Sequence, residues 1–201
     1  MIQRIELVVV EGDLEVEVAK KLLGRLGIKF SEQTIINKHG RMNFWPEVRR
    51  YNEVARKLGP VLALADLEEK PCAPALFEQY LPKGRHATFH CRLAVPTLES
   101  WLLADAERFA HFVGAPPDKI PRNPEREAHP KLTIVNLARR YAPRELRADL
   151  VPPLGSRGVE GPRYRDRMAG FVRDAWEPLE ARRRSRSLDR ALRALGRRPD
   201  P

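Results

Sequence analysis

The chain has few cysteines and no long apolar run. Only two cysteines, Cys72 and Cys91, occur in 201 residues. This excludes a disulfide scaffold and is typical of proteins in a reducing cytoplasm. No apolar stretch is long enough to span a membrane. The apolar run at residues 5–10 is too short for a signal peptide and ends in acids. We therefore expect a soluble cytoplasmic protein with no membrane partner.

Two common catalytic motifs are also missing. The chain has no Gly-x-x-x-x-Gly-Lys-Ser/Thr loop, so we do not expect it to be an ATPase by itself. It also lacks the Gly-x-Ser-x-Gly elbow of serine hydrolases. Cys72, His86, His90 and Cys91 are residue types that bind zinc, but their spacing matches no common zinc pattern. His90 and Cys91 would also point to opposite faces of a strand. The sequence therefore disfavours a zinc site.

Positive charge is what the chain has in excess. It holds 37 Lys and Arg against 27 Asp and Glu, a net charge of +10. Residues 182–198 hold eight arginines and a single acid, Asp189. Such an excess indicates an anionic partner, and Arg182, Arg183, Arg184 and Arg186 are the candidates for contact with a phosphate backbone. Two alternatives are an exposed basic tail and a source proteome in which many proteins are basic.

Short apolar runs alternate with amphipathic segments in the first half of the chain. The pattern predicts strands at 2–10, 34–37, 61–65 and 88–94, and helices at 14–26, 45–58, 74–80 and 97–113. This alternation predicts an α/β fold with a mostly parallel sheet between layers of helices. We place this core at residues 1–114.

The composition changes after Gly114. Proline-rich connections occupy 115–124 and 152–162. Helices are predicted at 131–141, 164–179 and 187–195, and a mobile loop at 155–162. We expect residues 115–201 to form a proline-rich connection and a basic, helical C-terminal extension.

Carboxylates follow two of the predicted strands directly. Glu11 follows the first, where Gly12 permits a tight turn, and Asp66 and Glu68 follow the third. Open α/β sheets place their ligands at the carboxyl ends of strands, and Mg²⁺ and Mn²⁺ prefer oxygen ligands. A cation held there would polarise a phosphodiester and activate water. Acids at two strand ends therefore predict a divalent-metal site at one sheet edge.

Each acid also has a purely structural interpretation. Glu11 then ends a strand at the surface, and Asp66 caps the turn that follows it. Asp13 is expected to be the N-cap of the helix at 14–26, and Glu15 in its first turn favours the helix dipole. Glu68 then lies in a solvated loop.

A third acidic segment follows the fourth predicted strand. Thr97 is the expected N-cap of the next helix, which places Glu99 in the first turn, near the same sheet edge. Glu99 either reaches the site or stabilises the helix dipole, and the residues favour neither. Asp105 points about 120° away from Glu99 on an ideal helix, so it is expected to cap a new turn at Ala106. Lys131, at the start of a helix, either approaches a phosphate or is solvated.

Taken in order, these motifs resemble those of the Toprim fold, which topoisomerases, bacterial primases, small ribonucleases and overcoming-lysogenization-defect nucleases share. Glu11, Gly12 and Glu15 are similar to its first motif, a Glu-Gly with an acid three residues after the glycine. The Asp-x-Asp motif corresponds to Asp66 and Glu68, where glutamate replaces the second aspartate. Residues 93–105 resemble the Leu-Glu-x-Trp-Leu-Leu-x-Asp signature of small standalone Toprim-like bacterial proteins, and residues 185–190 resemble their closing Ser-x-Ser-Phe stretch.

The resemblance, which covers nearly the whole chain, implies a Mg²⁺- or Mn²⁺-dependent phosphodiesterase of DNA or RNA. It implies that Glu11 is the principal metal ligand or general base and that Asp66 and Glu68 complete the metal site. We also expect Glu15 to be a metal ligand and Glu99 to be a catalytic residue. It also implies a role in defence or mobile-element biology beside a separate ATPase subunit, and it is compatible with an oligomer. The alternative is a non-catalytic module that binds nucleic acid or a partner. The Glu68 departure and the lack of a convincing catalytic lysine favour that alternative.

Overall fold

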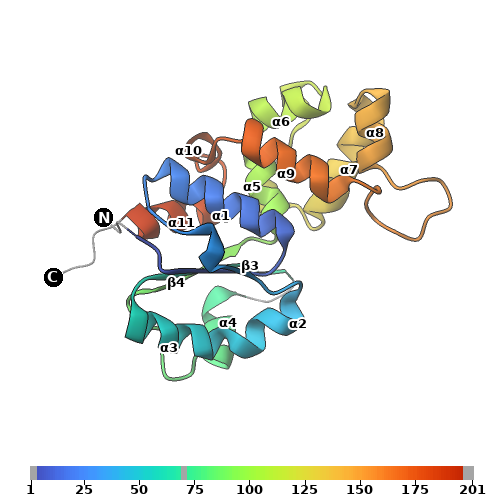
Figure 1. Cartoon of the computed structure of the whole chain (residues 1–201). Helices are drawn as coiled ribbons and strands as arrows, with labels where there is room; N and C mark the ends of the chain where they lie inside the picture. The colour runs from blue at the N-terminus through green and yellow to red at the C-terminus, as the bar shows by residue number, and fades with distance from the viewer. Residues whose placement is uncertain (1–3, 69–71, 197–201) are drawn as a thin grey trace.

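A four-stranded parallel sheet forms the centre of the computed structural model, which describes residues 4–68 and 72–196 (Figure 1). The strands are β1 (Leu7–Val10), β2 (Ile35–Asn37), β3 (Val61–Asp66) and β4 (Phe89–Ala94). Their order in the sheet is β2-β1-β3-β4, and all three pairs are parallel. The predicted α/β class is therefore confirmed.

Helices cover both faces of this sheet. One face carries α2 (Arg41–Phe44), α3 (Val48–Leu58) and α4 (Ala73–Tyr80), and the other carries α1 (Asp13–Arg25), α5 (Leu98–Ala104) and α11 (Arg186–Gly196). Strand side chains alternate between the two faces. Val8 and Leu62 therefore belong to the core beneath α1, and Val9 and Ala63 to the core above α3.

The C-terminal extension is helical, as predicted. It contains α7 (Pro130–Tyr141), α8 (Arg144–Leu150), α9 (Tyr164–Asp174) and α10 (Pro178–Ala181) in addition to α11, and α6 (Ala106–Val113) precedes it. Helix α9 packs on α1, and α11 packs on β4. Residues on both sides of position 114 thus share one hydrophobic core. Within the described part of the chain, no helix has the length and apolarity that a membrane span requires.

Several predicted boundaries change. Strand β1 begins at Leu7, preceded by an isolated bridge between Arg4 and Lys29. The part of the predicted strand before residue 4 lies outside the described residues. Pro46 falls in a short 3-10 turn (Trp45–Glu47), so α3 begins only at Val48.

Two differences concern the helical second half. The predicted helix at 164–179 ends at Asp174, because the Trp176 side chain is fully buried and the Glu177 amide donates to Asp105 Oδ2 (2.8 Å). Helix α8 was not predicted, because only Leu146 and Leu150 give it an apolar face. Asp105 caps α6, as expected.

The two signature segments meet in the core. Trp101 Nε1 donates to Ser187 Oγ (2.7 Å), which donates in turn to Glu125 Oε1 (2.7 Å). The same Glu125 oxygen accepts from Ser185 Oγ and from the Ser187 amide, both at 2.7 Å. This network holds α5 against the start of α11. Trp101 and the two serines therefore have a structural role.

Candidate metal centre

The register of β1 and β3 brings Glu11 and Asp66 to the same edge of the sheet. Val10 pairs with Leu64, and the Glu11 amide donates to the Leu64 carbonyl (3.2 Å). Both acids therefore leave neighbouring strands at their carboxyl ends, where α/β sheets bind ligands. Burial raises the pKa of Glu11, while the Asp66 backbone amide and Arg41 partly offset the effect.

Gly12 makes room for a third acid. Its backbone is extended (φ −151°), a conformation open to any residue, so the backbone itself does not require glycine here. A Cβ at this position would lie 2.9 Å from Glu15 Oε2. Glycine therefore leaves space for the Glu15 carboxylate. Gly12, not Asp13, is the N-cap of α1, and Asp13 instead accepts from Asn37 Nδ2 (2.6 Å) on β2.

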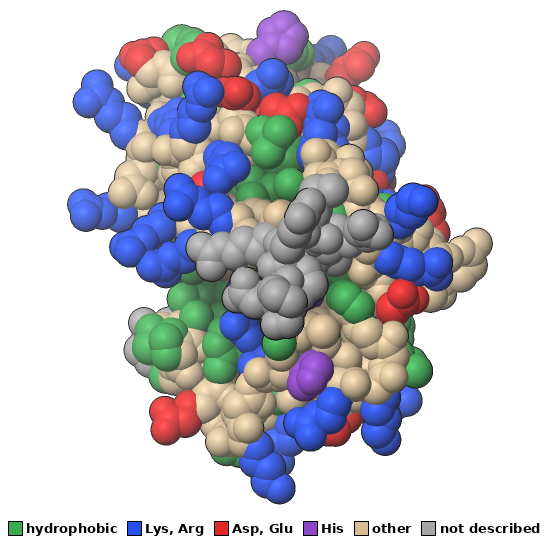
Figure 2. Space-filling view, turned by 90° about the vertical axis from the view of Figure 1, so that its left-hand side faces the viewer, with side chains coloured by type: hydrophobic (Ala, Val, Ile, Leu, Met, Phe, Trp, Pro, Cys, Tyr) green, Lys and Arg blue, Asp and Glu red, His purple; other side chains and the backbone are tan. Residues whose placement is uncertain are grey.

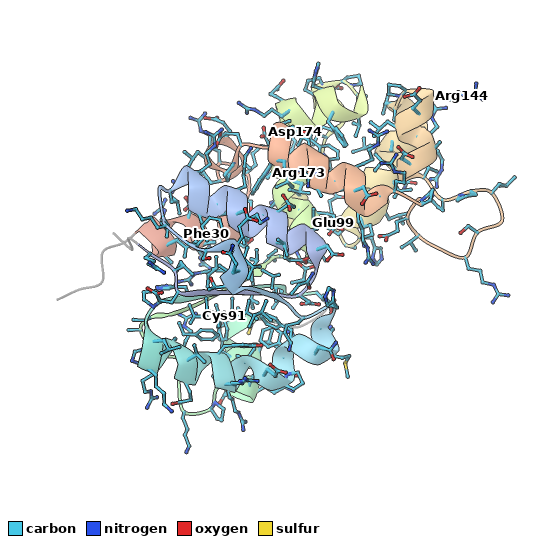
Figure 3. The ribbon with its side chains drawn as sticks, viewed as in Figure 1. Phe30, Cys91, Glu99, Arg144, Arg173 and Asp174 are labelled. Atoms are coloured by element: carbon cyan, nitrogen blue, oxygen red, sulfur yellow. The ribbon has the colours of Figure 1, made fainter. Side chains whose placement is uncertain are left out.

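The start of α5 holds Asp66 and Glu99. Asp66 Oδ1 accepts from the Leu98 amide (2.8 Å) and so satisfies a free N–H of the helix. Thr97 is the N-cap, as predicted, and its hydroxyl donates to Glu99 Oε2 (2.8 Å). Glu99 is 5% exposed and lies on the α1 side of the sheet (Figure 3). Its buried position on this side places Glu99 with the acids of the sheet edge.

The Lys131 side chain is 38% exposed and lies between two carboxylates. Its Nζ lies 2.8 Å from Glu160 Oε2 and 3.7 Å from Glu99 Oε1. It also lies 5.4 Å from the centre of the Tyr164 ring. Burial opposes its charge, but Glu99 and Glu160 together raise the pKa of Lys131. Sequence reasoning missed Glu160 and Tyr164, because a proline- and glycine-rich connection with no periodic pattern precedes α9.

Neighbouring acids raise the cost of charge on Asp66 and on Glu15. Burial, followed by Glu15, Glu99 and Glu11, raises the pKa of Asp66 well above its ordinary value. Burial also raises the pKa of Glu15 to about 7, with Glu99 and Glu11 adding to the effect and Lys131 opposing it. Ionising these acids together is therefore unfavourable, and a bound cation would relieve that cost.

Glu68 differs from these four acids in its partner, Arg41, whose charge also acts on the pKa of Glu11. The Glu68 backbone has a φ of 53°, and its carboxylate forms an ion pair with Arg41. Within the described residues, Glu68 is not among the acids that shift the pKa of Asp66 or Glu15. The structure thus brings together Glu11, Glu15, Asp66 and Glu99, and it leaves Glu68 beside Arg41.

The donor chemistry of the group fits Mg²⁺ or Mn²⁺. Glu11 Oε2 is buried and has no hydrogen-bond partner among the residues that the structure describes. Over residues 4–68 and 72–196, however, no three His, Cys, Asp or Glu side chains are arranged to hold one ion. One oxygen of Asp66 accepts from the Leu98 amide, and one oxygen of Glu99 accepts from the Thr97 hydroxyl. The buried Glu11 oxygen is still compatible with Mg²⁺, which commonly takes only one or two carboxylates and keeps several waters.

The predicted basic residues lie near α10 and α11, on the side shown in Figure 2, where Lys and Arg side chains are numerous. Arg182 donates to Asp189 (2.7 Å), and Arg184 donates to the Arg122 carbonyl (3.4 Å). Arg183 is 74% exposed and pairs with Glu180 (3.1 Å). Arg186 is exposed and has no ion pair among the described residues. The four arginines line one shallow hollow.

The chain was compared with models of protein families, with curated proteins and with solved structures, and none of them matches it.

Proposed function

We propose that the chain is a Mg²⁺- or Mn²⁺-dependent phosphodiesterase that acts on DNA or RNA, as its resemblance to Toprim-like proteins implies. One observation carries the proposal. Four carboxylates gather at the carboxyl edge of a parallel sheet, and one buried oxygen among them, Glu11 Oε2, has no partner in the described structure. An uncompensated buried acid is costly unless a cation or a proton satisfies it.

The position of each residue suggests its role. Glu11 and Asp66 would hold the cation, and Glu15 and Glu99 would add negative charge around it. When bound, the cation supplies Lewis-acid stabilisation of a phosphodiester. Lys131 would contact a phosphate oxygen of the substrate at the edge of the group. We also propose that the chain works together with a separate ATPase subunit.

Cleavage assays test this function. Purified wild-type protein is expected to cut plasmid DNA, single-stranded DNA or RNA in Mg²⁺ or Mn²⁺ but not in a chelator. Glu11→Gln keeps the shape of the side chain but removes the charge that a hard cation requires, so it is expected to abolish the cleavage. An equally fast Glu11→Gln protein would assign the activity to another site or to a contaminant.

A non-catalytic module that binds nucleic acid or a partner is the second candidate. The pairing of Glu68 with Arg41 favours it, because the second acid of the Asp-x-Asp position is then withdrawn from the site. Binding of nucleic acid without cleavage of any of the three substrates, in either metal, would support this candidate over the first.

The predicted arginines near α10 and α11 are expected to bind the phosphates of nucleic acid. Of the four predicted residues, Arg183 and Arg186 are exposed, whereas Arg182 and Arg184 are engaged within the protein. Replacing Arg183 and Arg186 with alanine is therefore expected to weaken binding similarly for all sequences. It should lower the slope of log affinity against log salt by up to about 1.8 for duplex DNA, or about 0.9 per phosphate contact.

The control for this double variant is a second double variant that loses two positive charges on another surface of the protein. Arg50 and Arg56 are exposed on α3, on the opposite face of the sheet. Their replacement by alanine should leave the slope within error of wild type. If the Arg183/Arg186 variant also kept the wild-type slope, these arginines would not contact the backbone.

A further inference from the structure

Glu160 lies at the end of the connection between α8 and α9, beside the candidate metal centre. Its Oε2 is 2.8 Å from Lys131 Nζ, and its Oε1 is 3.2 Å from Arg165 Nε. The side chain is only 23% exposed. Glu160 therefore helps to fix the position of the Lys131 ammonium, whose charge acts on the pKa of Glu15.

Lys131 has two carboxylates within reach. Its Nζ is closer to Glu160 than to Glu99, at 2.8 Å against 3.7 Å. Both carboxylates attract the ammonium and raise the pKa of Lys131, Glu99 through its charge and Glu160 also through its hydrogen bond, so the two compete for its position. An ammonium that moved onto Glu99 would neutralise one of the acids and act as an internal competitor of any metal ion.

The connection does not depend on Glu160 for its place. The Gly161 amide donates to the Leu150 carbonyl (3.0 Å), and the Arg163 amide donates to the Asp149 carbonyl (3.1 Å). The backbones also approach so closely that a Cβ on Gly161 would lie 2.4 Å from the Asp149 oxygen. Because backbone contacts anchor the segment, removing the Glu160 charge is expected to move Lys131 rather than the chain.

We propose that Glu160 is a positioning residue that draws the Lys131 ammonium away from Glu99 and so keeps the acidic group open to a divalent cation. This inference rests on the proposed function, since it assumes that the acids bind a metal ion. It adds to that function a residue from the C-terminal extension that sets the strength of metal binding.

Titration of Mn²⁺ into the full chain, followed by calorimetry, tests the inference without any cleavage assay. Glu160→Gln keeps the shape of the side chain but frees Lys131 to pair with Glu99. It is expected to weaken Mn²⁺ binding roughly 5- to 10-fold, the equivalent of about 1 kcal/mol. Lys131→Met, which keeps an apolar chain over Tyr164, is expected to bind Mn²⁺ more tightly than wild type. The double variant should match Lys131→Met.

Glu180→Gln is the matched control, because Glu180 pairs only with exposed Arg183 in the described structure, and it should bind Mn²⁺ like wild type. Thermal melting of each variant checks that the fold is retained. Wild-type affinity in Glu160→Gln would overturn the inference alone, as would a double variant as weak as Glu160→Gln. A wild-type chain that binds no Mn²⁺ would overturn the proposed metal site as well.

Discussion

Asp66→Asn is expected to abolish metal-dependent cleavage while making the metal-free protein more stable at neutral pH. Asparagine keeps the Oδ1 acceptor that receives the Leu98 amide at 2.8 Å, so the start of α5 retains its partner. The substitution removes the charge that a hard cation needs. The expected loss in rate is on the order of 10²-fold or more, the usual effect of deleting one preorganised electrostatic contact.

The gain in stability has the same physical origin. Burial and the nearby charges of Glu15, Glu99 and Glu11 raise the pKa of Asp66, so its ionised form costs free energy in the folded state. Asparagine removes that cost. A site that is strained without its cation commonly shows this exchange between activity and stability.

Cleavage rates in Mg²⁺ or Mn²⁺ measure the first effect. Urea unfolding at pH 7.5 in a chelator measures the second. Glu53→Gln, an exposed glutamate on α3, is the control and should change neither. Glu68→Gln tests whether Glu68 is a metal ligand, as the sequence predicts, or only a partner of Arg41. Because Glu68 pairs with Arg41, its loss is expected to reduce cleavage far less than Asp66→Asn. An Asp66→Asn protein that cleaved normally would remove Asp66 from the metal centre.

The strands that place the site were predictable because burial leaves a simple pattern. The runs that became β1 and β3 are almost wholly apolar, as strands covered on both faces must be. Parallel strands then put their carboxyl ends at one edge, which is why Glu11 and Asp66 could be paired from sequence. The capping position of Asp105 followed in the same way from helical geometry.

What could not be predicted depends on contacts between segments distant in sequence. Glu68 has the right spacing, but the ion pair with Arg41 determines where it points. The sequence favours neither of two roles for Glu99, a residue of the site or a partner of the helix dipole. Its burial depends on the packing of α5, which no local pattern shows. Glu160 reaches the site from a connection without periodicity, 29 residues after Lys131. No local pattern carries that information.

The second large effect concerns pH and the Glu15 carboxyl. Its pKa is raised to about 7 from 4.5, so between these values the folded state binds more protons than the unfolded state. Stability from this group is therefore fully present below about pH 4.5 and falls as the pH rises to about 7, by up to ~3 kcal/mol. His90 acts in the opposite direction, because burial lowers its pKa from 6.5 to about 4 and stability rises with pH across that window. The pH profile of wild type alone therefore does not isolate Glu15.

The difference between Glu15→Gln and wild type removes the His90 contribution, which is equal in both, and reports Glu15 together with the effect of its charge on the pKa of Asp66. Without metal, the variant is expected to gain stability over wild type as the pH rises from 4.5 to 8, by up to ~3 kcal/mol. Saturating Mn²⁺ should shrink or reverse that difference, because a cation that binds only the folded state stabilises it by mass action, and more strongly in the wild type if Glu15 contributes to its binding. Urea unfolding at five pH values, with and without Mn²⁺, measures both. A difference independent of pH would show that Glu15 is not buried among like charges. A pH-dependent difference that Mn²⁺ leaves unchanged would place the cation away from Glu15.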